Sequence, residues 1–183
     1  IIESGGALIL RNSTFYMNLD YDAQYMIDVK AGGNLTLIGS KITAYDPDNN
    51  YYITVRKGSV FYMENSEISY AGNNSTYPGL TISTDNVKIL ASRIRYNFIG
   101  IKIANSVGSL SNITIRNTTI NNNTNDGILI YHSKYAYPLG NISLVNVTIA
   151  NNSKYGLDLN TEWDNIINIT IENARILLSL IHI

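Results

Sequence analysis

The nine residues Asn112-Ile-Thr-Ile-Arg-Asn-Thr-Thr-Ile120 decide the fold, because the chain repeats their pattern from end to end. The frame returns as Asn141-Ile-Ser-Leu-Val-Asn-Val-Thr-Ile149 and as Asn168-Ile-Thr-Ile-Glu-Asn-Ala-Arg-Ile176. Four further copies fit upstream, so that seven copies begin at positions 7, 34, 60, 86, 112, 141 and 168, 26–29 residues apart. A regular internal period of this length indicates a stacked repeat architecture.

Each copy predicts three short strands. The second and fourth positions of the frame are apolar, the ninth is Ile or Phe, and mostly polar residues lie between them. This period of two is typical of strands with one buried face. A further strand of the form Gly-Ile-x-Ile follows, as in Gly100–Ile103 and Gly127–Ile130. One copy is too short to bury a face alone, so the copies are expected to stack and share a core.

This arrangement resembles the right-handed parallel β-helix of the pectate-lyase superfamily, over essentially the whole chain. The handedness follows from the resemblance and from the rule for parallel crossovers. We therefore predict an all-β, right-handed parallel β-helix (a solenoid) of about seven coils, with three short strands per coil and one structural unit spanning residues 1–183. Both ends fall in mid-coil, which leads us to expect a segment of a longer chain or a unit that stacks end to end.

The composition excludes several classes of protein. The chain has 13 basic and 14 acidic side chains, so it lacks the positive charge of a typical nucleic-acid-binding protein. It has no Cys and two His, which excludes disulfides and thiolate metal sites. No apolar run approaches the about 18 residues needed to span a bilayer, so we expect no membrane insertion. The 28 Ile, 25 Asn and 14 Tyr instead favour strands and tight turns.

One asparagine column stands at the corner between the first two strands of each coil. The sixth frame position is Asn in five copies, at Asn12, Asn65, Asn117, Asn146 and Asn173. Stacked amides are able to hydrogen-bond along the axis of a β-helix. We therefore predict an inward-facing asparagine ladder at this corner, as the family resemblance also implies. The alternative is that Asn only reflects the preference of this residue for turns.

Eleven Asn-x-Ser/Thr sequons make N-linked glycans the main expected modification. Three of their asparagines, Asn12, Asn117 and Asn146, belong to the predicted ladder and are expected to be inaccessible. The other eight are expected to face outward or to lie in outer loops: Asn34, Asn73, Asn74, Asn112, Asn122, Asn141, Asn151 and Asn168. Glycans at these sites imply an extracellular protein.

Two acidic loops suggest a calcium site. Asp20 and Asp22 occupy the same loop position as Asp46 and Asp48 one coil further on. Stacking brings four carboxylates together, and calcium prefers such oxygen ligands. We therefore consider a structural calcium ion, and no other cofactor, for this chain. The alternative is that these aspartates only form turns.

A group of loop aromatics is a candidate contact surface for sugar rings or for a protein partner. It comprises Tyr131, Tyr135, Tyr137 and Trp163, in the two long loops after the Gly-type strands of copies five and six. The alternative, which the sequence favours, is that these rings fold back over the rim of the core.

Catalysis is not expected from this segment. Enzymes of the superfamily carry acids and bases on the Gly-type strands, where this chain has Asp28, Lys102 and Asp158. A glycosidase needs two carboxyl groups within about 5 to 10 Å, and the sequence shows no second acid beside Asp158 on this strand column of the adjacent coils.

The sequence therefore predicts a structural segment of an extracellular, N-glycosylated cell-surface or filament protein, of the S-layer, adhesin or fibre type. Its bias in composition resembles that of archaeal surface glycoproteins. The expected partners are other copies or flanking domains of the same surface protein. The alternative is a β-helix that binds or cleaves carbohydrate.

Overall fold

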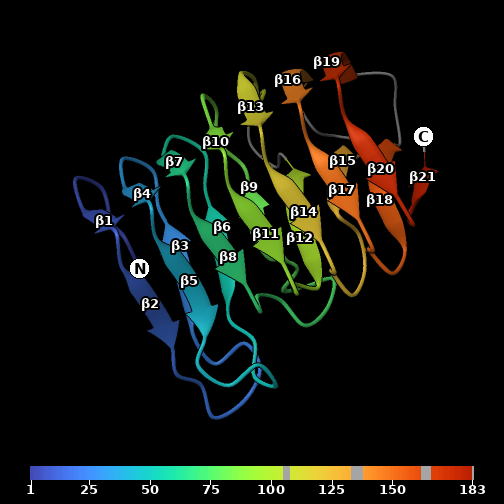
Figure 1. Cartoon of the computed structure of the whole chain (residues 1–183). Coiled ribbons are helices and arrows are strands. Elements are labelled where there is room, and N and C mark those ends of the chain that lie inside the picture. The colour runs from blue at the N-terminus through green and yellow to red at the C-terminus, as the bar shows by residue number, and fades with distance from the viewer. Residues whose placement is uncertain (105–107, 133–137, 162–165, 183) are drawn as a thin grey trace.

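The computed structural model describes residues 1–104, 108–132, 138–161 and 166–182. These residues form a solenoid of three parallel sheets, each with seven strands (Figure 1). Every strand pairs with its equivalent one coil away, which confirms the predicted parallel β-helix and its three strands per coil. The solenoid makes about six turns, close to the predicted number of about seven coils. Within the described residues, no helix has the length and apolar character needed to cross a membrane.

The first sheet carries the Ile-x-Ile part of the repeat. Its inward side chains stack in register, so that Leu35 lies beside Phe61 and Leu37 beside Met63, all with 2% exposure or less. The seven strands are β1 (Ala7–Arg11), β4 (Asn34–Ile38), β7 (Val60–Glu64), β10 (Lys88–Leu90), β13 (Ile113–Arg116), β16 (Leu139–Val145) and β19 (Ile166–Glu172). Burial of each large apolar side chain contributes about 1.5–3 kcal/mol, so this row is a major source of stability.

The second sheet carries the end of the repeat frame, with the ninth residue pointing inward. Ile42, Ile68, Ile94, Ile120 and Ile149 are fully buried in one stacked row. The seven strands are β2 (Thr14–Met17), β5 (Lys41–Ala44), β8 (Glu67–Ser69), β11 (Arg93–Arg95), β14 (Thr119–Asn121), β17 (Thr148–Ala150) and β20 (Arg175–Leu177). The intervening side chains face outward and form the surface described below.

The third sheet carries the Gly-type strands. A Cβ added to Gly100 would lie 2.5 Å from the carbonyl oxygen of Gly127, and one added to Gly127 would lie 2.6 Å from that of Gly156. Glycine therefore recurs here because the next coil approaches too closely for a side chain. The seven strands are β3 (Met26–Val29), β6 (Tyr52–Val55), β9 (Gly79–Ile82), β12 (Ile99–Ala104), β15 (Ile128–His132), β18 (Tyr155–Thr161) and β21 (Leu180–His182).

The predicted inward asparagine ladder is wrong. All five asparagines of the column are exposed, and each has a left-handed backbone, with φ between 47° and 53°. The residues are Asn12, Asn65, Asn117, Asn146 and Asn173. A left-handed residue turns the chain sharply from the first sheet into the second, and Asn tolerates this conformation better than other residues with a side chain. One amide contact does link successive coils, from Asn146 Nδ2 to Asn117 Oδ1 at 3.1 Å, but it lies on the surface.

A hydroxyl ladder fills the inner side of this corner instead. Ser40 Oγ accepts a hydrogen bond from the backbone N–H of Ser13, Ser66 Oγ accepts one from Ser40, and Ser92 Oγ accepts one from Ser66, at 3.0–3.2 Å. Thr118 Oγ1 accepts the next bond, from Ser92, at 3.3 Å. Each of these hydroxyls also donates to the carbonyl group two residues earlier in its own coil. The corner is therefore closed by serine, one position beyond the predicted asparagine.

A buried asparagine ladder does exist, at the corner that leads into the third sheet. Asn97 Oδ1 accepts a hydrogen bond from the backbone N–H of Ala71 at 2.8 Å, and Asn123 Oδ1 accepts one from Asn97 at 3.0 Å. Asn152 Oδ1 accepts from both the backbone and the side chain of Asn123, at 3.1 and 2.8 Å. The three asparagines are at most 3% exposed. At the turn the backbone N–H groups lose their hydrogen-bond partners in the sheets, and the asparagine side chains accept their hydrogen bonds instead.

Replacement of Asn123 by leucine is expected to lower the free energy of unfolding by about 1–3 kcal/mol, because the buried N–H of Asn97 loses its acceptor. The matched control is Asn65→Gly in the exposed column, where Gly39 already occupies the equivalent position with φ of 58°. This control is expected to change the stability by no more than about 0.5 kcal/mol. Urea unfolding followed by circular dichroism measures both, and equal losses in the two variants would contradict the assignment of the ladder.

Candidate functional site

The outer face of the second sheet gathers the polar side chains that the repeat places outward. Thr14, Lys41, Glu67, Arg93 and Thr119 lie in one row, because the strands pair in register from coil to coil. The row runs along the solenoid axis with a spacing of about 4.8 Å per coil. It therefore presents a polar strip whose chemistry changes from one coil to the next.

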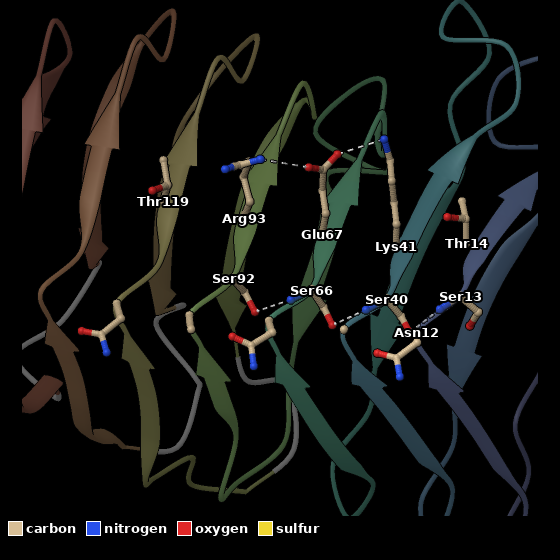
Figure 2. Close-up of a pocket in the computed structure, with 14 residues that line it drawn as sticks. Asn12, Ser13, Thr14, Ser40, Lys41, Ser66, Glu67, Ser92, Arg93 and Thr119 are labelled. Carbon is tan, nitrogen blue, oxygen red and sulfur yellow. Dashed lines mark hydrogen bonds and ion pairs between the residues drawn. The ribbon is translucent and has the colours of Figure 1, made fainter.

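A polar groove follows this row along the corner between the first and second sheets (Figure 2). Its volume is about 580 Å³, and it extends over the first five coils. The lining combines the exposed corner residues Asn12, Asn65 and Asn117 with the hydroxyl ladder and with the outward row. Amides, hydroxyls and charged groups offer donors and acceptors in regular steps, which suits an extended polar ligand that lies parallel to the axis.

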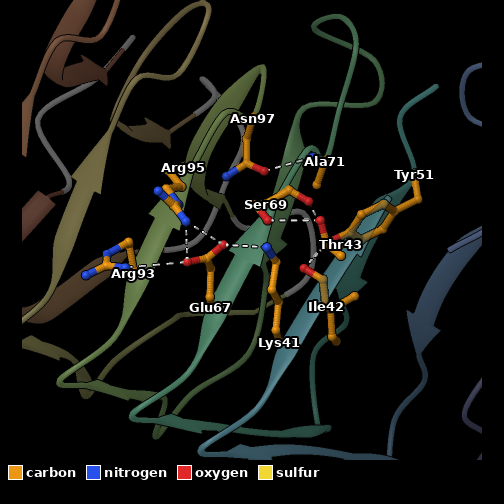
Figure 3. Close-up of polar contacts among 10 residues, drawn as sticks. All are labelled: Lys41, Ile42, Thr43, Tyr51, Glu67, Ser69, Ala71, Arg93, Arg95 and Asn97. Carbon is orange, nitrogen blue, oxygen red and sulfur yellow. Dashed lines mark hydrogen bonds and ion pairs between the residues drawn. The ribbon is translucent and has the colours of Figure 1, made fainter. Parts of the chain in front are cut away.

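The centre of the groove is a charge cluster around Glu67 (Figure 3). Lys41 Nζ lies 3.0 Å from Glu67 Oε1, and Arg95 Nη2 lies 3.0 Å from Oε2. Arg93 Nη1 is more distant, at 3.7 Å from Oε2. Burial alone raises the pKa of Glu67, whose side chain is 13% exposed, but the hydrogen bonds from Lys41 and Arg95 outweigh this effect and hold its pKa below the usual value. Glu67 therefore pairs with three cationic side chains, which favour the ionised form of its carboxyl group over the protonated form.

Tyr51 lies in the loop before the third sheet, and its side chain contacts the inner side of the second sheet (Figure 3). Its ring is fully buried, and its hydroxyl group donates to the carbonyl groups of Ile42 at 2.9 Å and Ser69 at 3.2 Å. Burial raises the pKa of Tyr51 well above its ordinary value, so the phenol stays neutral and remains a donor. These hydrogen bonds fix the two strands of the second sheet that carry Lys41 and Glu67 on their outer face.

Tyrosine rings line the opposite edge of the second sheet. The rings of Tyr70 and Tyr96 stack with centroids 5.2 Å apart and planes 18° apart. The guanidinium carbon of Arg95 lies 5.1 Å from the centroid of Tyr96. Tyr16 and Tyr45 form a second, edge-to-face pair with centroids 6.0 Å apart. These rings escaped the sequence analysis, although Tyr70 and Tyr96 are 26 residues apart and occupy the same position of the repeat.

Tyr70 and Tyr96 both have a left-handed backbone, with φ of 57°. In the same corner position, the fifth and sixth coils carry Asn122 and Asn151 with φ of 56° and 54°. A bulky side chain in this conformation costs about 1–2 kcal/mol relative to the ordinary helical conformation, and Asn tolerates it more easily. Two coils therefore carry a bulky tyrosine at a corner position whose left-handed backbone favours Asn.

A hollow of about 390 Å³, called the tyrosine hollow below, lies beside the stacked pair. Its lining includes Asp22, Asn50, Asn73 and Asn97 in addition to the two rings. Asn73 Oδ1 and Asn97 Nδ2 are buried, and neither has a hydrogen-bond partner within the described residues. A buried acceptor and a buried donor thus belong to residues that line one cavity.

The predicted calcium site is not formed. In the part of the chain that the structure describes, no three acidic or histidine side chains gather into a group able to hold a metal ion. Asp46 Oδ1 accepts the backbone N–H of Asp48 at 3.0 Å, and Asp22 Oδ1 accepts that of Asn50 at 2.7 Å. Asp20 contacts Gln24. Within the described residues, these carboxylates hydrogen-bond to amide groups of the turns, as the alternative proposed.

The eight predicted glycan acceptors all reach the surface. Five are exposed, namely Asn74, Asn112, Asn141, Asn151 and Asn168, and three are half-buried, namely Asn34, Asn73 and Asn122. The expectation that Asn12, Asn117 and Asn146 are inaccessible is wrong, since they belong to the exposed corner column. Sequence reasoning assigned them to the wrong side of the corner.

Three of the four candidate contact aromatics, Tyr135, Tyr137 and Trp163, lie outside the described residues. The fourth, Tyr131, is half-buried, and the Nζ of Lys102 lies 5.6 Å from the centroid of its ring. Burial lowers the pKa of Lys102. This pair is therefore a packed cation–π contact on the third sheet.

Acidic groups on the outer face of the third sheet are paired. Asp28, 1% exposed, accepts two hydrogen bonds from Arg56 at 2.6 and 3.0 Å and lies 2.9 Å from Lys30 Nζ. Burial raises the pKa of Asp28, but these cations outweigh the effect and lower it. Asp158 Oδ1 lies 2.8 Å from Nδ1 of His182 on the next coil. Both acids thus have a partner on an adjacent coil, as the stacked column allows.

These features define a parallel β-solenoid with a polar groove and a tyrosine edge on one sheet. The family model for the right-handed beta helix region matches residues 1–176, and the chain belongs to this family. The match agrees with the predicted right-handed coil. The family includes both enzymes and non-enzymes. No curated protein and no solved structure matches the chain significantly.

Replacement of Glu67 by glutamine is expected to destabilise the protein by about 1–2 kcal/mol at pH 7, because three cations lose their anion. The pKa of Glu67 is lowered in the folded state, so its contribution is present above the unfolded value, about 4.3, and is lost as the pH falls through the folded value. The difference between wild type and variant should therefore shrink between pH 5 and pH 3, about where carboxylates titrate.

Urea unfolding across this pH range measures the difference. The exposed Glu172→Gln is the control, and its effect is expected to be small at every pH. An effect of Glu67→Gln that is independent of pH would show that the ion pairs do not stabilise the fold.

Proposed function

We propose that this β-helix is a rigid, N-glycosylated structural segment of an extracellular surface or filament protein, of the S-layer, adhesin or fibre type. The observation that carries the proposal is the position of the sequons. All eleven of their asparagines are exposed or half-buried, and none lies in the core. This distribution supports the proposal, because a sequon in the core would not be modified in the folded protein.

The acceptors form rows along the axis. Asn112 Nδ2 donates to Oδ1 of Asn86 at 3.2 Å, and Asn168 Nδ2 donates to Oδ1 of Asn141 at 3.3 Å, all at the corner that leads into the first sheet. A second row follows the corner between the first and second sheets. Glycans attached in such rows would coat the solenoid on several sides, which suits a surface structure exposed to its surroundings.

The internal ladders supply the rigidity that a structural segment requires. Hydroxyl and amide side chains link consecutive coils at two different corners, in addition to the backbone pairing of three sheets. Bending the solenoid would break these axial contacts together. Its repeated, locally stacked coils also allow such a segment to be lengthened without a change in cross-section.

Glycopeptide mapping by mass spectrometry, on protein isolated from its native source, tests the proposal. Glycan is expected on outward sequons such as Asn112 and Asn141. Asn65 and Asn173 are internal controls, because they share the exposed column with Asn117 but lack Ser or Thr two residues later. A native protein without glycan at any sequon, recovered from inside the cell, would overturn the proposal.

Carbohydrate binding is a second candidate function, favoured by the outer face of the second sheet. Stacked tyrosine rings lie along one edge of this face and the polar groove along the other. Aromatic rings and amide or hydroxyl groups together are the chemistry by which proteins hold sugars, since a sugar ring has both apolar and hydroxyl-bearing faces. A structural surface protein with this second function would act as an adhesin.

A further inference from the structure

The tyrosine hollow combines features that the structural role does not explain. It has a volume of about 390 Å³, and the stacked rings of Tyr70 and Tyr96 form part of its lining. Asn73 and Asn97 also line it, and they bring a buried acceptor and a buried donor that have no partner within the described residues. Buried polar atoms in folded proteins are almost always hydrogen-bonded, so these two amides lack the partners that such groups normally have. Both atoms are covered in this conformation, so they meet a group in the hollow only after a small rotation of their side chains.

We propose that the tyrosine hollow binds a neutral sugar ring, which packs against Tyr70 and Tyr96 and hydrogen-bonds to the amide groups of Asn73 and Asn97. This inference rests on carbohydrate binding as the second candidate function and names its site. A volume of this size suits a ligand of one or two sugar units, because pockets for small molecules begin at about 300 Å³.

The chemistry of the lining selects this class of ligand. A sugar hydroxyl group both donates and accepts, so it is able to satisfy Asn73 Oδ1 as an acceptor and Asn97 Nδ2 as a donor once these covered side chains rotate toward the hollow. The apolar C–H face of a pyranose packs on an aromatic ring. Asp22 is the ionisable acid of the described lining, and its Oδ1 already accepts two hydrogen bonds from Asn50. The described lining contains no Lys or Arg, which disfavours an acidic sugar.

The backbone supports the same assignment. Tyr70 and Tyr96 are left-handed in a column where later coils carry Asn122, Asn151 and, away from the hollow, Leu178 in the same conformation. The corner itself therefore does not require a ring. Strained residues that persist in a fold often serve a functional site, and here both strained rings line the hollow.

The sugar has two sources, which share one chemistry. It is either a residue of a separate saccharide or the first residues of a glycan on this chain. Asn73 and Asn122 begin sequons and line the hollow, so a glycan attached there lies close enough to fold onto the rings.

Titration of the unglycosylated full chain with neutral sugars tests the proposal. Glucose, galactose, mannose, N-acetylglucosamine and their disaccharides are the probes, and binding is followed by saturation-transfer NMR and calorimetry. The variants Tyr70→Asn and Tyr96→Asn are expected to weaken binding about tenfold or more, the equivalent of losing one aromatic contact. Both should fold, because Asn occupies the same corner position in the fifth and sixth coils.

Two controls make the test specific. Tyr96→Phe keeps the ring and is expected to retain binding, and Tyr45→Asn removes an exposed ring outside the hollow and should have no effect. Galacturonate is expected to bind more weakly than galactose. In glycosylated protein, binding of free sugar that appears only after both sequons are removed, by Ser75→Ala and Thr124→Ala, would identify the chain's own glycan as the occupant. Binding without these changes would identify a separate saccharide.

The outcomes distinguish the inference from the function on which it rests. Sugar binding that is unaffected by Tyr70→Asn and Tyr96→Asn would overturn the hollow as the site and leave carbohydrate binding in place. Failure of every neutral sugar to bind at millimolar concentration would overturn both. Neither result bears on the glycosylated structural role, which is decided by glycopeptide mapping.

Discussion

The in-register pairing of each coil with the next is the constraint on which the rest of this structure depends. Because equivalent residues stack directly above one another, every choice of side chain is repeated along the axis at about 4.8 Å. Apolar residues become continuous rows, serines and asparagines become ladders, and opposite charges on adjacent coils become ion pairs, as at Glu67 and Asp28. A residue in this fold is therefore surrounded chiefly by its counterparts in the repeat, about 26 positions away, and much less by its neighbours in the chain.

This constraint explains why the sequence predicted the sheets so well. The period of two within the frame and the period of 26–29 residues between copies are sufficient to place all three strands and their register. The corners are harder, because a left-handed residue interrupts the alternation. Leu8 and Leu10 point inward, which by simple counting assigns Asn12 to the inside as well. In the third coil the next inward positions are instead those of the buried Ser66 and Ile68, so Asn65, the equivalent of Asn12, lies on the outside.

The candidate site was not predicted from the sequence, for a related reason. The outward row of the second sheet follows from the strand pattern, but the capture of Glu67 by Lys41 and Arg95 depends on how far each side chain reaches across the coils. The tyrosine hollow is built at corners and loops, where the repeat carries least information. Its signal in the sequence was the recurrence of Tyr at positions 70 and 96, one repeat apart. The calcium prediction failed in the same region, because turn amides bind the carboxylates of Asp22 and Asp46.

The left-handed corners also bear on how such a surface could evolve. Eight of the eleven sequons begin at an asparagine with positive φ, and in six of these a strand supplies an outward Ser or Thr after an apolar or small residue. The geometry that turns the chain thus favours the asparagine of the acceptor motif, while Asn65, Asn86 and Asn173 have the same conformation without Ser or Thr two residues later. A lineage that duplicates a coil duplicates its acceptor too, so the density of attachment sites grows in proportion to the length of the solenoid. Exposure to a glycosylating compartment would then be enough to turn a bare scaffold into a coated one, with no change in its folding.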